Sequence, residues 1–287
     1  MLLLADKYLQ PRTAPIYSHE ELLKYGNEFD AYIVGSDQVW RPIYVPDIKE
    51  FFFDFVSRPN AKLVSYAASF GNSSPEYSIE DVSSCRKLIK RFTTVTLRED
   101  TGVQVFKKLG FECENVHIVL DPTLLLPKDY YMQMAGPAQK KRGGLFCYVL
   151  DCNESVTQIV NKVSEEKKLT PYFILDRKKW ERRSYVMPSI EDWLYGFINA
   201  DYVITDSFHG TVFCVIFNKP FVVCANDRRG NDRFTSLLTM FGLNNRLASC
   251  QNDAVKIIST EINWKNVNKV LEQERNFSKR ILQESLS

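Results

Sequence analysis

The feature that constrains the fold most is an alternation of short apolar segments with segments of helical periodicity along the chain. Strands are predicted at residues 30–34, 62–68, 93–97, 116–120, 145–150, 172–175, 202–205 and 220–224. Helical periodicity lies between several of them and returns near residues 267–282. Because strands that alternate with helices form parallel sheets through right-handed crossovers, we expect an α/β protein with parallel sheets.

A segment rich in lysine and glycine interrupts the alternation at residues 137–144. This composition is typical of a linker between domains. The 287 residues suffice for two domains of ordinary size. We therefore expect two Rossmann-like domains, at residues 1–140 and 141–287, each with a doubly wound parallel sheet.

Charge and cysteine content narrow the class of protein. A formal net charge of +2 is too small to indicate a nucleic-acid surface or a polybasic membrane anchor. The seven cysteines are scattered and lack C-x-x-C spacing, which favours a reducing compartment. No secretion signal and no apolar run of the ~18 residues needed for a membrane span is recognisable. We therefore expect a cytoplasmic protein without a transmembrane segment or a nucleic-acid partner.

Polar turns follow four of the predicted strands. In a parallel sheet the carboxyl ends of the strands meet at one edge, and ligands bind outside that edge. The turns are Gly35-Ser36-Asp37-Gln38, Ser69-Phe70-Gly71, Arg98-Glu99-Asp100 and Thr205-Asp206-Ser207-Phe208-His209-Gly210. We expect them to line one cleft, although Ser36 and Asp37 are also the residue types that cap a helix.

His209 is the strongest candidate for a catalytic residue. The chain has three histidines, and only this one lies between a strand end and an apolar helix start. Amide groups at a helix N-terminus attract anions, and a histidine at that position suits a general acid or base. A structural histidine that hydrogen-bonds a backbone carbonyl is the alternative.

Two arginines are candidates for binding an anion. Arg98 could hold a carboxylate or phosphate with its two-pronged guanidinium, or could pair with Glu99 or Asp100 in solvent. Arg233 ends a charged loop after the strand at 220–224, and such a loop either binds an anion or is solvated.

Other motifs give little support to further sites. Asp121-Pro122 is predicted to be a turn that ends a strand, with contact to a ligand as the alternative. Walker-type glycines, G-x-G-x-x-G and a metal-spaced His/Cys cluster are absent from the sequence, so we expect neither a metal site nor a nucleotide cofactor.

Considered together, the strand-end motifs resemble those of the polysaccharide pyruvyl transferase family. The stretches that carry the resemblance are residues 30–40, 65–71, 98–100, 121–123, 200–210 and 218–220. Members of this family transfer a pyruvyl group from phosphoenolpyruvate to sugar hydroxyls of surface polysaccharides, which forms a ketal. The resemblance implies a fold like the two-Rossmann GT-B glycosyltransferases.

The resemblance also implies roles for individual residues. Arg98 would hold the carboxylate or phosphate of the donor, and His209 would be the catalytic acid or base. The expected substrate-binding residues are Ser36, Asp37, Gln38, Ser69, Gly71, Asp206, Ser207, Gly210, Thr211 and Arg233. Phosphoenolpyruvate would be the donor substrate without a further cofactor, and the acceptor would be a lipid-linked or nucleotide-linked saccharide, met in the cytoplasm or at the inner face of the membrane.

Two departures from the family pattern bear on these roles. Many members have an arginine two residues before the histidine, where this chain has Ser207, so another residue would have to supply that anion contact. Relatives also place about one βαβ unit before the segment that matches Asp6 to Leu9, so we expect a first domain truncated at its N-terminus. The alternatives are a GT-B glycosyltransferase that uses a nucleotide sugar, and a non-catalytic binding protein of a polysaccharide locus. The acceptor sugar and the oligomeric state are not indicated.

Overall fold

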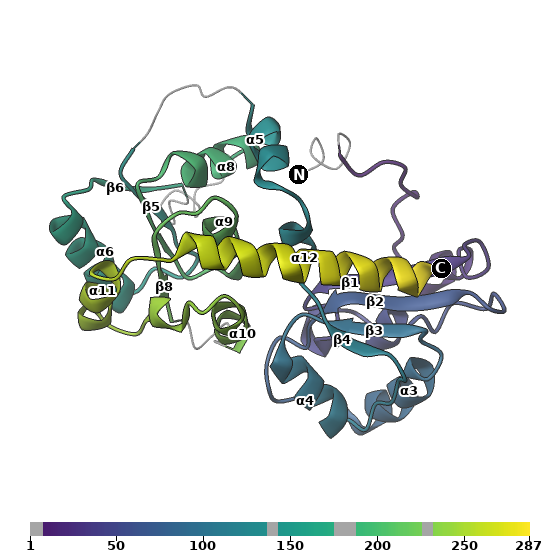
Figure 1. Cartoon of the computed structure of the whole chain (residues 1–287). Helices are drawn as coiled ribbons and strands as arrows, with labels where there is room; N and C mark the ends of the chain where they lie inside the picture. The colour runs from purple at the N-terminus through teal and green to yellow at the C-terminus, as the bar shows by residue number, and fades with distance from the viewer. Residues whose placement is uncertain (1–7, 137–142, 175–187, 226–231) are drawn as a thin grey trace. The chain divides into compact units, whose positions relative to one another are not determined.

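The computed structural model describes residues 8–136, 143–174, 188–225 and 232–287. The chain divides into two compact units (Figure 1). Unit 1 comprises Met1–Pro122 and Asn276–Ser287, and unit 2 comprises Thr123–Arg275. Each unit contains one parallel sheet, so the expected α/β class with two parallel sheets is confirmed.

The sheet of unit 1 consists of four parallel strands in the order in which they occur in the chain. They are β1 (Ala31–Asp37), β2 (Lys62–Ala68), β3 (Thr94–Leu97) and β4 (Val116–Ile118). Asp37 pairs with Ala68, and this places the end of β1 beside the end of β2. The strand order does not reverse among the described strands, so the doubly wound order expected for this half is not found there.

Helices and an aromatic core complete the first part of unit 1. The helical segments are α2 (His19–Leu23), η1 (Pro42–Tyr44), η2 (Ile48–Phe52), α3 (Ile79–Ile89) and α4 (Asp100–Lys108). The rings of Trp40 and Phe52 stack at 4.9 Å, and both side chains are fully buried. Trp40 follows the polar turn after β1, so its packing fixes the chain directly behind that turn.

The C-terminal helix α12 (Trp264–Leu286) contributes residues to both units. Its last part, from Asn276 onward, belongs to unit 1. There the hydroxyl of Ser278 accepts a hydrogen bond of 3.0 Å from the backbone N–H of Leu120, just beyond β4. The end of the chain is therefore part of the packing of its first half.

The sheet of unit 2 is doubly wound. Its strands are β5 (Leu145–Tyr148), β6 (Pro171–Phe173), β7 (Tyr202–Thr205), β8 (Phe221–Cys224) and β9 (Leu247–Ala248), all parallel. Their order is β6-β5-β7-β8-β9. The chain first winds from β5 outward to β6 and then returns to the other side of β5, so the order reverses between β5 and β7.

The helical segments of unit 2 connect and cover these strands. They are η3 (Pro122–Leu125), α5 (Lys128–Ala135), α6 (Glu154–Lys167), α8 (Ile190–Asn199), α9 (Phe208–Ile216), α10 (Asp232–Met240), η4 (Asn244–Arg246) and α11 (Gln251–Ile258). Apolar residues of α6 and α11, among them Ile159 and Ile257, share one buried cluster with β5 and β7. None of the helices in these described ranges is both long and apolar enough to cross a membrane.

The division between the units differs from the expected boundary at residues 140 and 141. Helix α5 precedes that boundary but belongs to unit 2. The ring of Tyr131 on α5 packs edge-on against Phe213 on α9, with 4.9 Å between the centroids. This contact lies within unit 2; most of the lysine-rich segment, residues 137–142, lies outside the described residues.

Candidate active site

The turn after β7 lies at the point where the strand order of unit 2 reverses. In open α/β sheets this reversal opens a crevice at the carboxyl ends of the two strands, and ligands bind there. The turn after β5 and the turn after β7 lie on the two sides of this reversal. The Asp206 carboxylate joins them, because it accepts hydrogen bonds of 2.6 Å from Leu150 N–H and 2.8 Å from Asp151 N–H. Asp206 is almost fully buried.

Three hydroxyl side chains near Asp206 hold the turn and the start of α9 together. Thr205 donates a hydrogen bond of 2.7 Å to the carbonyl oxygen of Tyr148, which is its register partner on β5. Ser207 is the N-cap of α9, and its hydroxyl accepts a hydrogen bond from the N–H of Gly210. Thr211 donates to the carbonyl oxygen of Ser207 at 3.1 Å. The hydroxyls of Ser207 and Thr211, which are predicted to bind substrate, therefore bond to backbone groups at the start of α9.

Position 210 requires a glycine because atoms of Thr205 and Tyr148 lie very close to its backbone. A Cβ atom at this position would lie 2.2 Å from Oγ1 of Thr205 and 3.1 Å from the ring of Tyr148. Any side chain would push α9 away from the ends of β5 and β7. The glycine thus brings the helix N-terminus against the sheet edge and beside Tyr148.

His209 lies in the first turn of α9 and is partly exposed, whereas its neighbours in the turn are buried. Its ring packs edge-on against Phe208, with 5.4 Å between the centroids. The side chain therefore reaches solvent at the positive end of a helix and at the carboxyl edge of the sheet. Proton transfer to or from a bound ligand is the chemistry that this position suits.

In unit 1 the polar turns meet around the guanidinium of Arg98. Its Nη1 donates to Asp121 at 3.0 Å, its Nη2 to Asp37 at 3.1 Å, and its Nε to Glu99 at 3.4 Å. The side chains of Arg98, Glu99 and Asp121 are at most 3% exposed, while that of Asp37 is 56% exposed. We call this set of four residues the Arg98 ion-pair network.

Neighbouring residues extend this network into the turn after β2. Ser69 donates a hydrogen bond of 2.5 Å to Oε1 of Glu99 and accepts one from Gly71 N–H. Gln38 accepts a hydrogen bond of 3.3 Å from Arg41 through its side-chain oxygen. Ser36, two positions before Gln38, is partly buried within β1. The structure thus brings the predicted residues of the first three turns together at one edge of the sheet of unit 1.

The contacts of Arg98 differ from those expected of a donor ligand. Burial alone would lower its pKa, but Glu99, Asp121 and Asp37 together raise the pKa above its ordinary value. Each of the three guanidinium nitrogens already faces a carboxylate of the same unit. Arg98 thus pairs with Glu99, as the alternative has it, but the pair lies in the interior rather than in solvent.

Sequence reasoning gives Asp121 only as a turn residue, and it does not pair Asp37 with Arg98, although Asp37 is a predicted site residue. Asp37 ends β1 and Asp121 follows β4, and both strands belong to the same parallel sheet as β3, so the shared edge was the available signal. Tyr148 was assigned only to a strand, yet it ends β5 directly opposite Thr205.

Two further observations concern possible ligands. Arg233 falls at the start of α10, and its side chain lies outside the described part of the structure. Among the described residues there is no group of three or more His, Cys, Asp or Glu side chains arranged to hold a metal ion.

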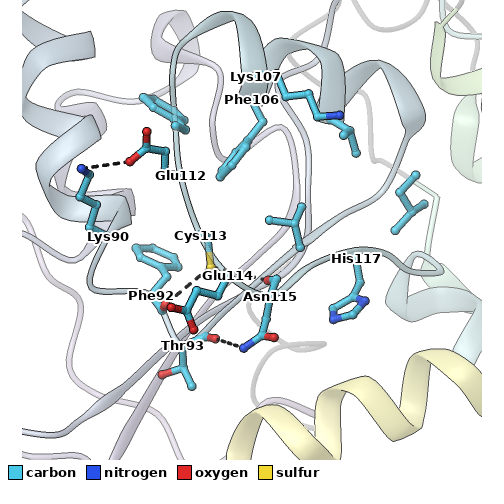
Figure 2. Close-up of a pocket in the computed structure, with 14 residues that line it drawn as sticks. Lys90, Phe92, Thr93, Phe106, Lys107, Glu112, Cys113, Glu114, Asn115 and His117 are labelled. Atoms are coloured by element: carbon cyan, nitrogen blue, oxygen red, sulfur yellow. Dashed lines mark hydrogen bonds and ion pairs between the residues drawn. The ribbon is translucent and has the colours of Figure 1, made fainter.

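A groove of about 1220 Å³ lies elsewhere in unit 1, between α4 and the edge strand β4 (Figure 2). Phe92, Phe106 and Phe111 give it an apolar lining, and Lys90 and Glu112 form an ion pair of 3.0 Å at its margin. None of the described residues that line it belongs to the predicted site. The groove is formed by the segments that enter β3 and β4, whereas the polar turns follow the strands.

Comparison with known proteins identifies the family. The family model described as polysaccharide pyruvyl transferase matches residues 3–228. The match spans most of the chain and includes every strand-end turn described above. The chain therefore belongs to the polysaccharide pyruvyl transferase family, as its strand-end motifs predict. A search of the curated proteins gives no match.

Solved structures resemble the fold. A UDP-N-acetylglucosamine 2-epimerase from Rickettsia bellii is similar with a TM-score of 0.53 and 13% identity, over 92% of this chain and 76% of that one. HepE from Anabaena, solved with UDP and glucose, has a TM-score of 0.47 and 12% identity, over 91% of this chain and 76% of that one. The first likeness supports the GT-B-like fold expected from the sequence.

Proposed function

We propose that this protein transfers a pyruvyl group from phosphoenolpyruvate to two hydroxyls of a saccharide, forming a ketal during the synthesis of a surface polysaccharide. Membership of the family supports a transferase. The observation that carries the proposal is the position of His209, which is partly exposed in the first turn of α9, just beyond the carboxyl end of β7, where the strand order reverses between β5 and β7.

The proposed chemistry accounts for each proton. The methylene carbon of phosphoenolpyruvate gains a proton, and the adjacent carbon becomes a cation that one sugar oxygen attacks. Phosphate leaves with the electrons of its bond to that carbon, and the second sugar oxygen closes the ketal. The two hydroxyls release two protons, of which one balances the methyl group and the other the departing phosphate. His209 is the group that we assign to proton transfer at the donor.

Charge complementarity supports donor binding near the same residue. Phosphoenolpyruvate carries a phosphate and a carboxylate, and the amide groups of a helix N-terminus favour such anions. Ser207, where many relatives have an arginine, caps α9 and leaves the turn without that cation. We therefore assign part of the donor charge to α9 and part to Arg233.

The test is an assay of the purified protein with phosphoenolpyruvate and a panel of saccharides, read by phosphate release and by the methyl signal of the ketal in NMR spectra. Phosphate release that requires both substrates supports the proposal. A parallel panel of nucleotide sugars examines the glycosyltransferase alternative. Turnover of a nucleotide sugar with no use of phosphoenolpyruvate would contradict pyruvyl transfer, and inactivity with both panels in a folded protein would favour a binding protein.

A further inference from the structure

The four residues of the Arg98 ion-pair network carry one positive and three negative charges. Arg98 contributes the positive charge, and Asp37, Glu99 and Asp121 contribute the negative charges. An anion that approached the guanidinium would have to displace a carboxylate and would meet two more. Separating the buried pairs of Arg98 with Glu99 and Asp121 would leave buried charges without compensation, which is unfavourable. This surrounding is unfavourable for binding a phosphate or a carboxylate of the donor.

The network instead fixes one accessible carboxylate. Glu99 and Asp121 are buried beside Arg98, whereas Asp37 is more than half exposed. Asp37 ends β1 with a positive φ of 65°, and its backbone carbonyl accepts a hydrogen bond of 2.9 Å from Ser69 N–H. The backbone is held by β2 and the carboxylate by Arg98, so little freedom remains for the side chain.

A fixed and exposed carboxylate is suited to sugar hydroxyls. Carboxylate oxygens accept hydrogen bonds from hydroxyl donors, and charge-assisted bonds are about twice as strong as neutral ones. A carboxylate already held by a protein group loses less conformational entropy when it binds such a ligand. The same carboxylate repels the anionic donor, so it favours the neutral hydroxyls of the acceptor.

We propose that Arg98 is a positioning residue, which holds Asp37 at the carboxyl edge of the sheet so that this carboxylate binds hydroxyls of the acceptor saccharide. This inference rests on the pyruvyl transfer proposed above, from which the two substrates are taken. It assigns Arg98 to the acceptor side of the reaction, although the resemblance implies a contact with the donor.

The test compares Asp37→Asn, Arg98→Lys and the double variant. Arg58→Lys is the matched control, because Arg58 pairs with Asp30 on the surface of the same unit. For each protein we measure the acceptor KM, the Kd of phosphoenolpyruvate by calorimetry, and saturation-transfer NMR signals from methyl glucoside and methyl galactoside. Thermal unfolding reports whether each variant folds.

We expect Asp37→Asn and Arg98→Lys each to raise the acceptor KM about tenfold, equivalent to about 1.4 kcal/mol. The Kd of phosphoenolpyruvate should change less than about threefold, and the double variant should be no worse than the more affected single variant, because the two residues act as a unit. Arg58→Lys should resemble the parent. A large loss of donor affinity with an unchanged acceptor KM would overturn the proposal.

Two outcomes separate this inference from the proposed function. If the parent protein neither binds nor consumes phosphoenolpyruvate, the proposed pyruvyl transfer is contradicted. The NMR signals of the methyl glycosides then test the role of Asp37 without the donor. Signals that weaken in Asp37→Asn support it, and unchanged signals overturn it. If Arg98→Lys does not fold, the exposed Asp37→Asn variant decides in the same way.

Discussion

The carboxylate of Asp206, directly after β7, accepts a hydrogen bond of 2.6 Å from the backbone N–H of Leu150, two positions after the end of β5. A second bond, from Asp151 N–H, uses the other carboxylate oxygen. The two strands on either side of the reversal in strand order are therefore joined beyond the end of their backbone pairing. Asp206 thus stabilises the site without requiring contact with a substrate.

Two substitutions of Asp206 should destabilise the protein to different extents. Asp206→Asn keeps one acceptor oxygen for the two amide groups, whereas Asp206→Ala removes both. Because each part-buried N–H left without an acceptor costs about 1–3 kcal/mol, we expect Asp206→Ala to lose more unfolding free energy than Asp206→Asn. Urea denaturation measures both. Equal losses would show that the hydrogen bond retained by asparagine contributes nothing.

Ser207 should act through capping. Its hydroxyl accepts the hydrogen bond from Gly210 N–H at the start of α9, so Ser207→Ala should cost about 1 kcal/mol of unfolding free energy. Ser207→Asp restores an acceptor and should recover most of the loss. Thermal unfolding measures both variants. If alanine were neutral, the cap would have no role in stability.

His209→Ala should abolish pyruvyl transfer while the melting temperature stays within about 4 °C of the parent, since a partly exposed turn residue contributes little core packing. His19→Ala is the matched control, because His19 is an exposed histidine on α2 that pairs with Glu50. The control should retain full turnover. Turnover by His209→Ala at the parental rate would remove this residue from the mechanism.

The stability of the protein should depend on the protonation of Asp54. Burial raises the pKa of Asp54, and one of its carboxylate oxygens is buried without a described hydrogen-bond partner. Because the folded pKa lies above the unfolded one, the stabilising contribution is complete below the unfolded pKa of about 4 and is lost as the pH rises through the folded pKa.

Asp54→Asn should therefore gain stability relative to the parent as the pH rises above the unfolded pKa of about 4 and through the higher folded pKa. The exposed Glu80→Gln on α3 is the control and should show no such trend. Melting curves across this pH range provide the measurement. A difference that shrinks with rising pH would reverse the assigned sign.

Two serines on α12 form a further matched pair. Ser278 accepts a hydrogen bond from Leu120 N–H, whereas Ser285 donates to the carbonyl oxygen of Ile281 within the helix; both serines are buried. Ser278→Ala leaves a buried N–H without this acceptor and should cost about 1–3 kcal/mol. Ser285→Ala should cost less. The reverse order in urea denaturation would contradict the anchoring of α12 through Ser278.

Local patterns predicted much of the fold. The strand at residues 202–205 and the helix at 190–199 coincide with β7 and α8. Strand β9 has only two residues, which is too short to produce a periodic signal. The division between the units depends on packing between residues far apart in the chain, such as Tyr131 and Phe213, and sequence patterns do not reveal such pairs.

The candidate site shows the same limit. The position of His209 between a strand and a helix follows from the sequence, because apolar runs and polar turns mark both ends. The partners of Arg98 do not follow from the sequence, because Asp37 and Asp121 lie 61 and 23 positions away from it. Family resemblance suggests a ligand for this arginine, but only the structure reveals that three carboxylates already surround it.

The contribution of α12 to unit 1 has a consequence for synthesis of the protein on the ribosome. Unit 1 contains Met1–Pro122, which emerge before unit 2, but also Asn276–Ser287, which emerge after it. The buried bond between Leu120 and Ser278 cannot form until the 158 positions that separate them have been translated. Unit 1 is thus begun before unit 2 but completed after it, and a chain released before α12 is made would carry an unfinished first unit.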